Sequence, residues 1–300
     1  MICEKLCGVL VASVTPVKED GALDLPAVGR LVEYYAASGL RGALFPSSTG
    51  ESFALTAQDR ISLVETAAKR APGGFAILGN CSEHNLKDAL RNARAMADAV
   101  CMPPQFLAYS QEELREYFFR IADESPIPLV VYNHMTRLPN KVGLPLLEEL
   151  SRHENILGIK DTHSDPNRML QLYARGVQRD FAILCGGDGV AAYAAALGME
   201  MLNALCAVKP KLFLNLYAAG RVGDLQRAAL YQREVDKLMG LFSALRGGLS
   251  SSTLFAQAIK AALSLKGLCG TASVQLGYPM EAAGFAKVKE IVDSVREEIA

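Results

Sequence analysis

The sequence has no excess of charge of either sign. Its 31 lysines and arginines are matched by 32 aspartates and glutamates, which gives a formal net charge of −1. General nucleic-acid binding needs a surplus of basic side chains that neutralise phosphates, so this class of function is not expected. Low-complexity segments are also absent, and a content of 50% hydrophobic and 21% charged residues is typical of a packed globular protein.

The sequence also lacks paired cysteines and an export signal. Seven cysteines are scattered along the chain, and no two of them have the CxxC spacing. An odd number of scattered cysteines indicates reduced thiols in a cytosolic protein. The first ten residues include Glu4 and Lys5 and have no sustained apolar core before a small-residue cleavage site. We therefore expect a cytoplasmic protein.

No apolar run has the character of a membrane span. The longest run, residues 190–208, contains Glu200, Asn203 and the helix-weakening Gly198. A charge at the centre of a bilayer costs ~2.5–3.5 kcal/mol on insertion scales. We predict that this run forms a buried helix followed by a buried strand.

Metal-binding and dinucleotide-binding motifs are missing as well. The four histidines have neither HxH nor HExxH spacing, which argues against a metal-dependent aldolase. The residues Gly186-Gly187-Asp188-Gly189 do not form the GxGxxG motif that binds dinucleotides. Cys185 has no identifiable base beside it in the sequence, so we expect it to pack in the core. The sequence predicts no metal and no cofactor.

What the sequence does contain is a repeated alternation of two kinds of segment. Eight short apolar runs have the composition of parallel strands that are covered on both faces; they span residues 8–15, 42–49, 75–81, 99–104, 128–133, 156–161, 181–188 and 199–206. Segments with helical periodicity lie between them, at residues 25–38, 57–70, 86–98, 111–124, 144–151, 167–177, 190–197 and 211–220.

Eight strand–helix units leave two architectures, an open doubly wound sheet or a closed barrel. An open sheet of that width needs edge strands with a more polar sequence, and none is evident. We therefore predict a (β/α)8 TIM barrel over residues 1–223. The strand signals stop after residue 223, and residues 224–242, 253–265 and 281–299 have helical patterns. We interpret residues 224–300 as a C-terminal helical extension packed on the barrel.

Barrel enzymes carry their chemistry at the carboxyl ends of the strands, and the sixth predicted strand ends in a lysine. Lys160 alternates with Gly158, so a strand period of two points its side chain into the barrel. A desolvated lysine amine is partly neutral near pH 7 and can attack a ketone to form a Schiff base. The alternative is a solvated lysine whose stem covers apolar surface.

Two other strand ends carry polar groups that suit such a lysine. Tyr132 closes the fifth predicted strand and is either a general acid/base or a core tyrosine. Arg137 follows it and either grips a carboxylate bidentately or lies on the surface. After the second strand, residues 47–51 read Ser-Ser-Thr-Gly-Glu, where hydroxyls and backbone N–H groups can converge on a carboxylate. The alternative there is a plain turn before the helix cap at Thr56.

Taken together, these strand ends resemble the dihydrodipicolinate synthase / N-acetylneuraminate lyase family of Schiff-base aldolases that act on pyruvate. The resemblance covers most of the chain. It is carried by Val14-Thr15-Pro16 with Asp20-Gly21, Ser48-Thr49-Gly50-Glu51, Ser110-Gln111, Tyr132-Asn133 and Gly158-Ile159-Lys160-Asp161.

The resemblance implies roles for the residues at the strand ends. It implies that Lys160 forms an imine with pyruvate and that Tyr132, hydrogen-bonded to Ser48, donates and accepts protons above it. It implies that Ser48 and Thr49 hold the pyruvate carboxylate.

Further implications concern the second substrate and the assembly. Arg137 lies where the synthase branch places an arginine for the carboxylate of the second substrate, and Gly186 matches a glycine that lines the pocket. Members of the family are commonly cytoplasmic homotetramers with a helical C-terminal extension.

The sequence departs from the family pattern at several positions. Ser47 replaces the first glycine of GTTGE, which removes a glycine's conformational freedom. Phe106 aligns with the tyrosine that completes the proton relay of the synthases. His134 and Met135 replace Val-Pro after Tyr132-Asn133, and His134 is either a substrate contact or a structural histidine. Gly189 stands where sialic-acid lyases carry a glutamate.

The sequence therefore predicts a cofactor-free lyase or synthase that combines pyruvate with, or releases it from, a small carbonyl compound. An activity like that of dihydrodipicolinate synthase is favoured by Arg137 and weakened by Phe106. A 2-keto-3-deoxy sugar-acid aldolase, an N-acetylneuraminate-type lyase and a dehydratase that uses the same imine stay open. A catalytically idle pyruvate-binding member is the alternative from another functional class.

Overall fold

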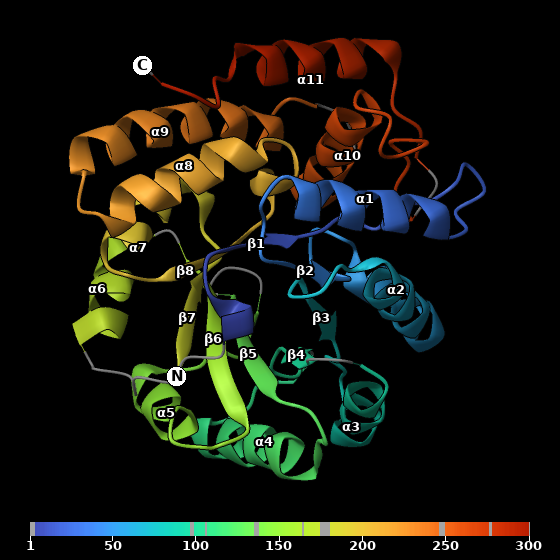
Figure 1. Ribbon diagram of the computed structural model, residues 1–300. Helices are drawn as coiled ribbons and strands as arrows, with labels where there is room; N and C mark the ends of the chain where they lie inside the picture. The colour runs from blue at the N-terminus through green and yellow to red at the C-terminus, as the bar shows by residue number, and fades with distance from the viewer. Residues whose placement is uncertain are drawn as a thin grey trace.

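The fold is a closed barrel of eight parallel strands surrounded by helices (Figure 1). The computed structural model describes residues 4–96, 99–105, 107–134, 138–163, 165–174, 181–245, 250–275 and 278–299. Strands β1 to β8 pair in chain order, and β8 closes the barrel on β1. They span Val9–Ala12, Gly42–Phe45, Ala76–Asn80, Ala99–Cys101, Leu129–His134, Ile156–Thr162, Ala182–Cys185 and Glu200–Asn203.

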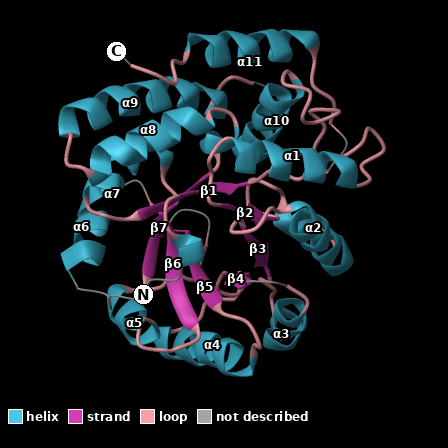
Figure 2. Ribbon diagram, viewed as in Figure 1, coloured by secondary structure: helices cyan, strands magenta, loops and turns pink. Residues whose placement is uncertain are grey.

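A helix follows every strand, and Figure 2 shows the helices as a ring outside the strands. The eight barrel helices, α1 to α8, are Leu25–Ala37, Ala57–Arg70, Leu86–Arg94, Gln111–Glu124, Leu144–Leu150, Pro166–Ala174, Ala191–Ala196 and Pro210–Arg221. The predicted (β/α)8 TIM barrel is thus confirmed. Capping boxes fix the starts of two of these helices: Thr56 with Asp59 before α2, and Ser110 with Glu113 before α4.

Six of the eight strands are shorter than the apolar runs that predicted them, whereas β5 has the length of its run and β6 is one residue longer. The run 42–49 forms a strand only as far as Phe45, where Pro46 has no N–H group to continue the ladder. The run 181–188 forms a strand only as far as Cys185. The remaining residues of each run form loops at the carboxyl end of the barrel, where the candidate functional groups lie.

The buried core has two layers that follow from the strand alternation. One cluster fills the barrel itself and includes Leu10, Leu44, Val130, Tyr132 and Leu202. A larger cluster fills the space between the strands and the helices. Side chains of parallel strands are therefore buried on both faces, which explains the continuous apolar runs.

Among the described residues after α8, three further helices follow the barrel helices. In Figure 1 they lie together on the side of the barrel that carries α8 and α1: α9 (Leu225–Leu238), α10 (Ser251–Ser264) and α11 (Ala282–Ser294). The helix predicted over residues 281–299 is too long at its C-terminal end, because α11 ends at Ser294 and the backbone of Val295 is extended. A short 3-10 turn, Met239–Phe242, continues α9.

Residues 190–208 form the predicted helix and strand, α7 and β8. The strand is buried as predicted, whereas the helix buries Ala191, Ala194 and Ala195 but exposes Tyr193. Glu200 is buried on β8, where its carboxylate accepts hydrogen bonds from Gly8 N at 2.5 Å and Tyr217 Oη at 2.6 Å. Within the described ranges, no helix combines the length and the apolar character needed to cross a bilayer.

Candidate active site

Lys160 and Tyr132 lie side by side at the carboxyl end of the barrel. They are register partners on β6 and β5, and only 3% of Lys160 and 1% of Tyr132 is exposed. The Lys160 Nζ lies 4.3 Å from the centroid of the Tyr132 ring. The lysine therefore sits against an aromatic face and is shielded from bulk water rather than lying over the outer surface.

The hydroxyl of Tyr132 reaches the loop that follows β2. Its oxygen lies 2.7 Å from Ser48 Oγ, and either group can donate the hydrogen bond. Thr49 follows Ser48 and lines the same cavity. Two adjacent hydroxyls beside an amine can pass a proton to or from a molecule bound there.

The loop after β2 is joined by side-chain hydrogen bonds to the segment that follows β1. Ser47 Oγ donates to Ser13 O at 2.8 Å and accepts from Gly50 N at 3.0 Å, and Thr15 Oγ1 donates to Gly50 O at 2.6 Å. Ser47 does not adopt a positive φ, so the conformational freedom of the glycine that it replaces is not needed here. Among the described residues other than glycine, Glu51 alone has a positive φ, 58°.

The residues that follow Tyr132 and Lys160 hold the two strands together. Asn133 Nδ2 donates to Asp161 Oδ2 at 3.0 Å, and Arg168 of α6 donates to the same oxygen from Nη2 at 2.7 Å and Nε at 3.0 Å. This outward-facing cluster lies behind the site and fixes the register that brings Tyr132 and Lys160 together. Our sequence interpretation missed it, although a buried amide and a buried carboxylate at two neighbouring strand ends are a usable signal.

A cavity of about 420 Å³ lies above these groups. The sequence-predicted residues Ser48, Thr49, Tyr132, Lys160 and Gly186 all line it. The other polar residues of its wall are His134 of β5 and four residues at or after the ends of β6 and β7: Thr162, His163, Asp165 and Asp188.

Gly186 makes room for the lysine. A Cβ atom at this position would overlap Thr162 Oγ1 and lie 3.0 Å from Lys160 Cε. The Gly186→Ala variant is therefore expected to fold but to form any Lys160 adduct at least about tenfold more slowly, because Thr162 must move away and the lysine side chain beside it must shift by a few tenths of an ångström. The rate of reductive trapping measures this. Gly189→Ala is the matched control, since its Cβ would meet only Met239 atoms at 3.5 Å or more, and a loss of equal size there would contradict the prediction.

Asp188 is an ionisable group that the cavity perturbs. Burial raises the pKa of its carboxyl from 3.8 to about 7, although the nearby Lys160 charge favours the ionised form. Its Oδ1 has no hydrogen-bond partner among the described residues. Burial also raises the pKa of the Cys185 thiol to about 12, which fits the packing role expected for that cysteine.

The Asp188 shift predicts a pH dependence of stability. Between about pH 4 and pH 7 the unfolded chain has lost this proton while the folded chain keeps it, so a rise in pH favours unfolding; above about pH 7 the effect stops growing. Compared with the Asp188→Asn variant, the free energy of unfolding of the wild type should fall by up to about 1.4 kcal/mol for each unit of pH across this window. Denaturant midpoints at pH 5, 6, 7 and 8 measure it, and parallel curves for the two proteins would contradict it.

Several sequence predictions fall on residues that the structure does not describe. Phe106, Met135 and Arg137 lie outside the described residues. His134 is described; it is 9% exposed, lines the cavity, and its ring centroid lies 6.2 Å from that of Tyr132. Across the described part of the chain, no group of three or more His, Cys, Asp or Glu side chains is placed to hold a metal ion.

Comparison with known proteins identifies relatives along the whole chain. The model of the dihydrodipicolinate synthetase family matches residues 5–294. A 4-hydroxy-tetrahydrodipicolinate synthase of Laribacter hongkongensis is 34% identical over 242 residues, which are 79% of this chain and 82% of that protein.

Solved structures share the fold. Dihydrodipicolinate synthase of Bacteroides thetaiotaomicron matches with a TM-score of 0.89 and 23% identity, over 97% of this chain and 99% of that one. A sialic acid aldolase of Ruminococcus gnavus matches with a TM-score of 0.87 and 20% identity over 96% of each chain. A prophage protein of the dihydrodipicolinic acid synthase family from E. coli K12, solved with pyruvate, matches with a TM-score of 0.84 and 23% identity, over 96% and 97% of the two chains. Synthase and aldolase relatives thus have the same barrel.

Proposed function

The chain belongs to the dihydrodipicolinate synthetase family, and from this premise we propose that Lys160 forms a Schiff base with pyruvate in a lyase or synthase reaction. Enzymes of this family are lyases of the class I aldolase type. The observation that carries the proposal is the buried Lys160 Nζ beside the Tyr132 ring, with the Tyr132 hydroxyl 2.7 Å from Ser48 Oγ. An amine, a proton carrier and a hydroxyl relay are what imine formation needs.

The first chemical step joins Lys160 to the keto carbon. The neutral Nζ attacks C2 of pyruvate, the carbonyl oxygen takes a proton, and loss of water gives a protonated imine. Tyr132 supplies and recovers these protons, with Ser48 as its hydrogen-bond partner. Loss of a proton from the methyl carbon then gives an enamine, because the iminium nitrogen accepts the electron pair.

The loop after β2 is suited to the carboxylate of pyruvate. Ser48 and Thr49 lie at the cavity wall, and the hydrogen bonds of Ser47 and Thr15 join residues 47–50 to the segment that follows β1. A loop held in this way loses less conformational entropy when its donors bind a carboxylate. Gly186 leaves the space in which the lysine side chain lies.

Reductive trapping tests the proposal. Borohydride added with pyruvate should leave one reduced pyruvyl group on the chain, located at Lys160 by peptide mass spectrometry. Pyruvate without borohydride, and borohydride without pyruvate, are the controls. An enzyme that turns over pyruvate without any trapped adduct would contradict the proposal.

The carbonyl partner distinguishes the members of the family. A partner like that of 4-hydroxy-tetrahydrodipicolinate synthase is supported by the Laribacter relative, while the 2-keto-3-deoxy sugar-acid, N-acetylneuraminate-type and dehydratase reactions would use the same imine. A trapped adduct without turnover of any partner would instead indicate an idle pyruvate-binding protein.

The assembly state and the cytoplasmic location stay predictions. The exposed apolar side chains of Leu170 and Tyr173 on α6 and of Tyr193 on the neighbouring α7 support an association of copies, since such side chains are often covered in oligomers. Light scattering would distinguish the predicted homotetramer from smaller forms.

A further inference from the structure

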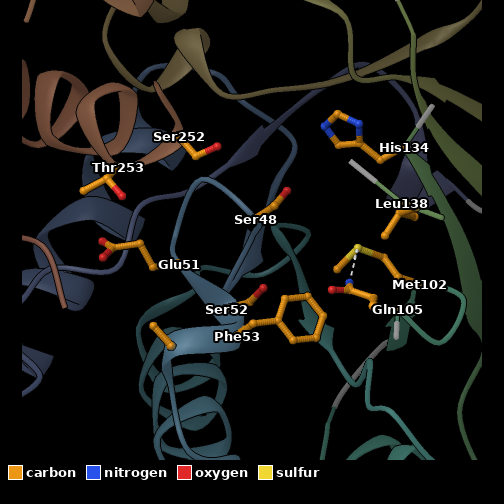
Figure 3. A pocket seen from close by; sticks show the side chains of 11 residues that line it. Ser48, Glu51, Ser52, Phe53, Met102, Gln105, His134, Leu138, Ser252 and Thr253 are labelled. Carbon is orange, nitrogen blue, oxygen red and sulfur yellow. Dashed lines mark hydrogen bonds between the residues drawn. The ribbon is translucent and has the colours of Figure 1, made fainter. Parts of the chain in front are cut away.

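A second cavity adjoins the one above Lys160. It has a volume of about 270 Å³, close to the lower end of the ~300–1,000 Å³ typical of small-molecule sites. Its walls come from the loops after β2, β4 and β5 and from the first turn of α10 (Figure 3). Ser48 and His134 line both cavities.

Most of the surface of this second cavity is apolar, although seven of the eleven residues that line it are polar: Ser48, Glu51, Ser52, Gln105, His134, Ser252 and Thr253. In Figure 3 the Phe53 ring, Met102 and Leu138 lie on one side, Ser252 and Thr253 of α10 on the other, and Ser48 between them. Met102 and Leu138 are almost fully buried, whereas 41% of Phe53 is exposed at the rim. An apolar group that packs against this wall is removed from water, and this burial makes binding more favourable.

The charged group in the wall is already paired. Glu51 Oε1 accepts from Lys260 Nζ at 2.6 Å, and Glu51 Oε2 accepts from Gln275 N at 2.7 Å. No arginine or lysine is among the described residues that line this cavity. The cation that the sequence offers for a carboxylate on a second substrate, Arg137, lies outside the described residues.

The two cavities meet at Ser48, the hydrogen-bond partner of the proposed acid/base Tyr132. Ser48 Oγ, which lines both, lies 2.7 Å from the Tyr132 hydroxyl. A carbonyl group at this boundary would face the enamine on Lys160 on one side, and its substituent would enter the second cavity on the other. Its oxygen would lie close to the Tyr132 and Ser48 hydroxyls.

We propose that the second cavity binds the apolar substituent of an acceptor aldehyde, so that the carbonyl partner of pyruvate is an alkyl or aryl aldehyde. The inference rests on the proposed imine at Lys160. In the forward direction the methyl-derived carbon of the enamine bonds to the aldehyde carbon. The carbonyl π electrons move to oxygen, which takes the Tyr132 proton, and water releases a 4-hydroxy-2-keto acid from the lysine. In the lyase direction the same aldehyde is released.

The hydroxyls of a polyhydroxylated partner would pair only with the smaller, polar part of this surface, to which Ser52, Gln105 and the hydroxyls of α10 belong. Each hydroxyl that leaves water without a hydrogen-bond partner costs about 1–3 kcal/mol. The polar side chains near the larger cavity, Thr162, His163 and Asp165, are the competing place for such a partner. The preference between acceptors therefore tells which cavity receives the second substrate.

A panel of acceptors tests the proposal. Butanal, glyceraldehyde and succinic semialdehyde are similar in length, and benzaldehyde adds an aromatic ring; each is assayed with saturating pyruvate by mass detection of the condensation product. We expect kcat/KM for butanal and benzaldehyde to exceed that for the other two by at least about tenfold. A preference for glyceraldehyde or succinic semialdehyde would overturn the inference, as would turnover of none of the four in a protein that traps pyruvate.

A pair of variants at the rim locates the effect. Phe53 lies on the short turn Ser52–Ala54 and is exposed enough to be replaced without loss of the fold. Phe53→Ser should lower kcat/KM for benzaldehyde about tenfold and leave trapping of pyruvate unchanged, while Phe53→Leu, which keeps an apolar contact, should stay within about threefold of wild type. Equal losses in both variants, or no loss in either, would overturn the inference. Absence of a pyruvate adduct in the wild type would instead contradict the proposed function itself.

Discussion

Replacement of Lys160 by alanine is expected to abolish the borohydride-trapped pyruvate adduct and to lower turnover by at least about 10³-fold, because the covalent route then has no amine. Lys160 lines the cavity beside Tyr132, so a trapped group there would identify both the nucleophile and the position of the keto carbon. The measurement is the intact mass of the protein after reduction, with the modified peptide sequenced. A full-strength adduct in Lys160→Ala would refute the assignment.

A second variant separates covalent chemistry from charge. Lys160→Arg keeps a positive side chain that can bind a carboxylate, but a guanidinium stays protonated and forms no imine. It should therefore retain part of the pyruvate binding and none of the adduct. Lys209→Ala is the matched lysine control, since Lys209 Nζ donates to Val295 O at 3.1 Å and does not line the cavity. Loss of the adduct in that variant would indicate a general effect on the fold.

The barrel could be predicted because its evidence is local in the sequence. Each strand is an apolar run, each helix has its own period, and several caps lie within four residues, as at Thr56 and Ser110. Closure also followed from local evidence, since no run had the polar sequence of an edge strand. The strand ends were predicted less accurately, because small uncharged residues, such as those at 47–49, were included in the runs although they follow Pro46 in a loop.

Other parts of the site depend on contacts between distant positions. The buried pair of Glu51 and Lys260 joins residues 209 positions apart, and burial lowers the pKa of Lys260 while the Glu51 carboxylate opposes that shift. This pair connects α10 to the loop that carries Ser48. Neither the pair nor the contribution of Ser252 and Thr253 to the second cavity has a signature in a single sequence, because nothing in the helix pattern of residues 253–265 says which loop it meets.

The substitution at position 47 shows where a family pattern misleads. Compared with the pattern, a serine in place of glycine suggested a loop with less freedom. In the structure that serine supplies a bridge, with one hydrogen bond to Ser13 O and one from Gly50 N. A family motif predicts which positions matter, but the physical role of a changed residue depends on the partners that the fold brings to it.

Replacement of Tyr132 by phenylalanine is expected to lower kcat by about 10²-fold or more with a much smaller change in pyruvate affinity. The variant keeps the ring against which Lys160 Nζ lies at 4.3 Å and removes the oxygen that lies 2.7 Å from Ser48 Oγ. Packing and the contact between cation and ring are therefore retained, and the loss reports the hydroxyl. Single-turnover trapping with borohydride, beside steady-state turnover, measures the two effects separately.

A variant of Ser48, the hydrogen-bond partner of Tyr132, is the control for this prediction. Ser48→Ala leaves the Tyr132 hydroxyl in place but removes the oxygen 2.7 Å away, so a smaller loss, of about tenfold, is expected if Tyr132 is the group that transfers the proton. A rate for Tyr132→Phe within about threefold of wild type would count against the acid/base role. A larger loss in Ser48→Ala than in Tyr132→Phe would move that role to the serine, because the hydroxyl whose removal costs more is the one on which proton transfer depends.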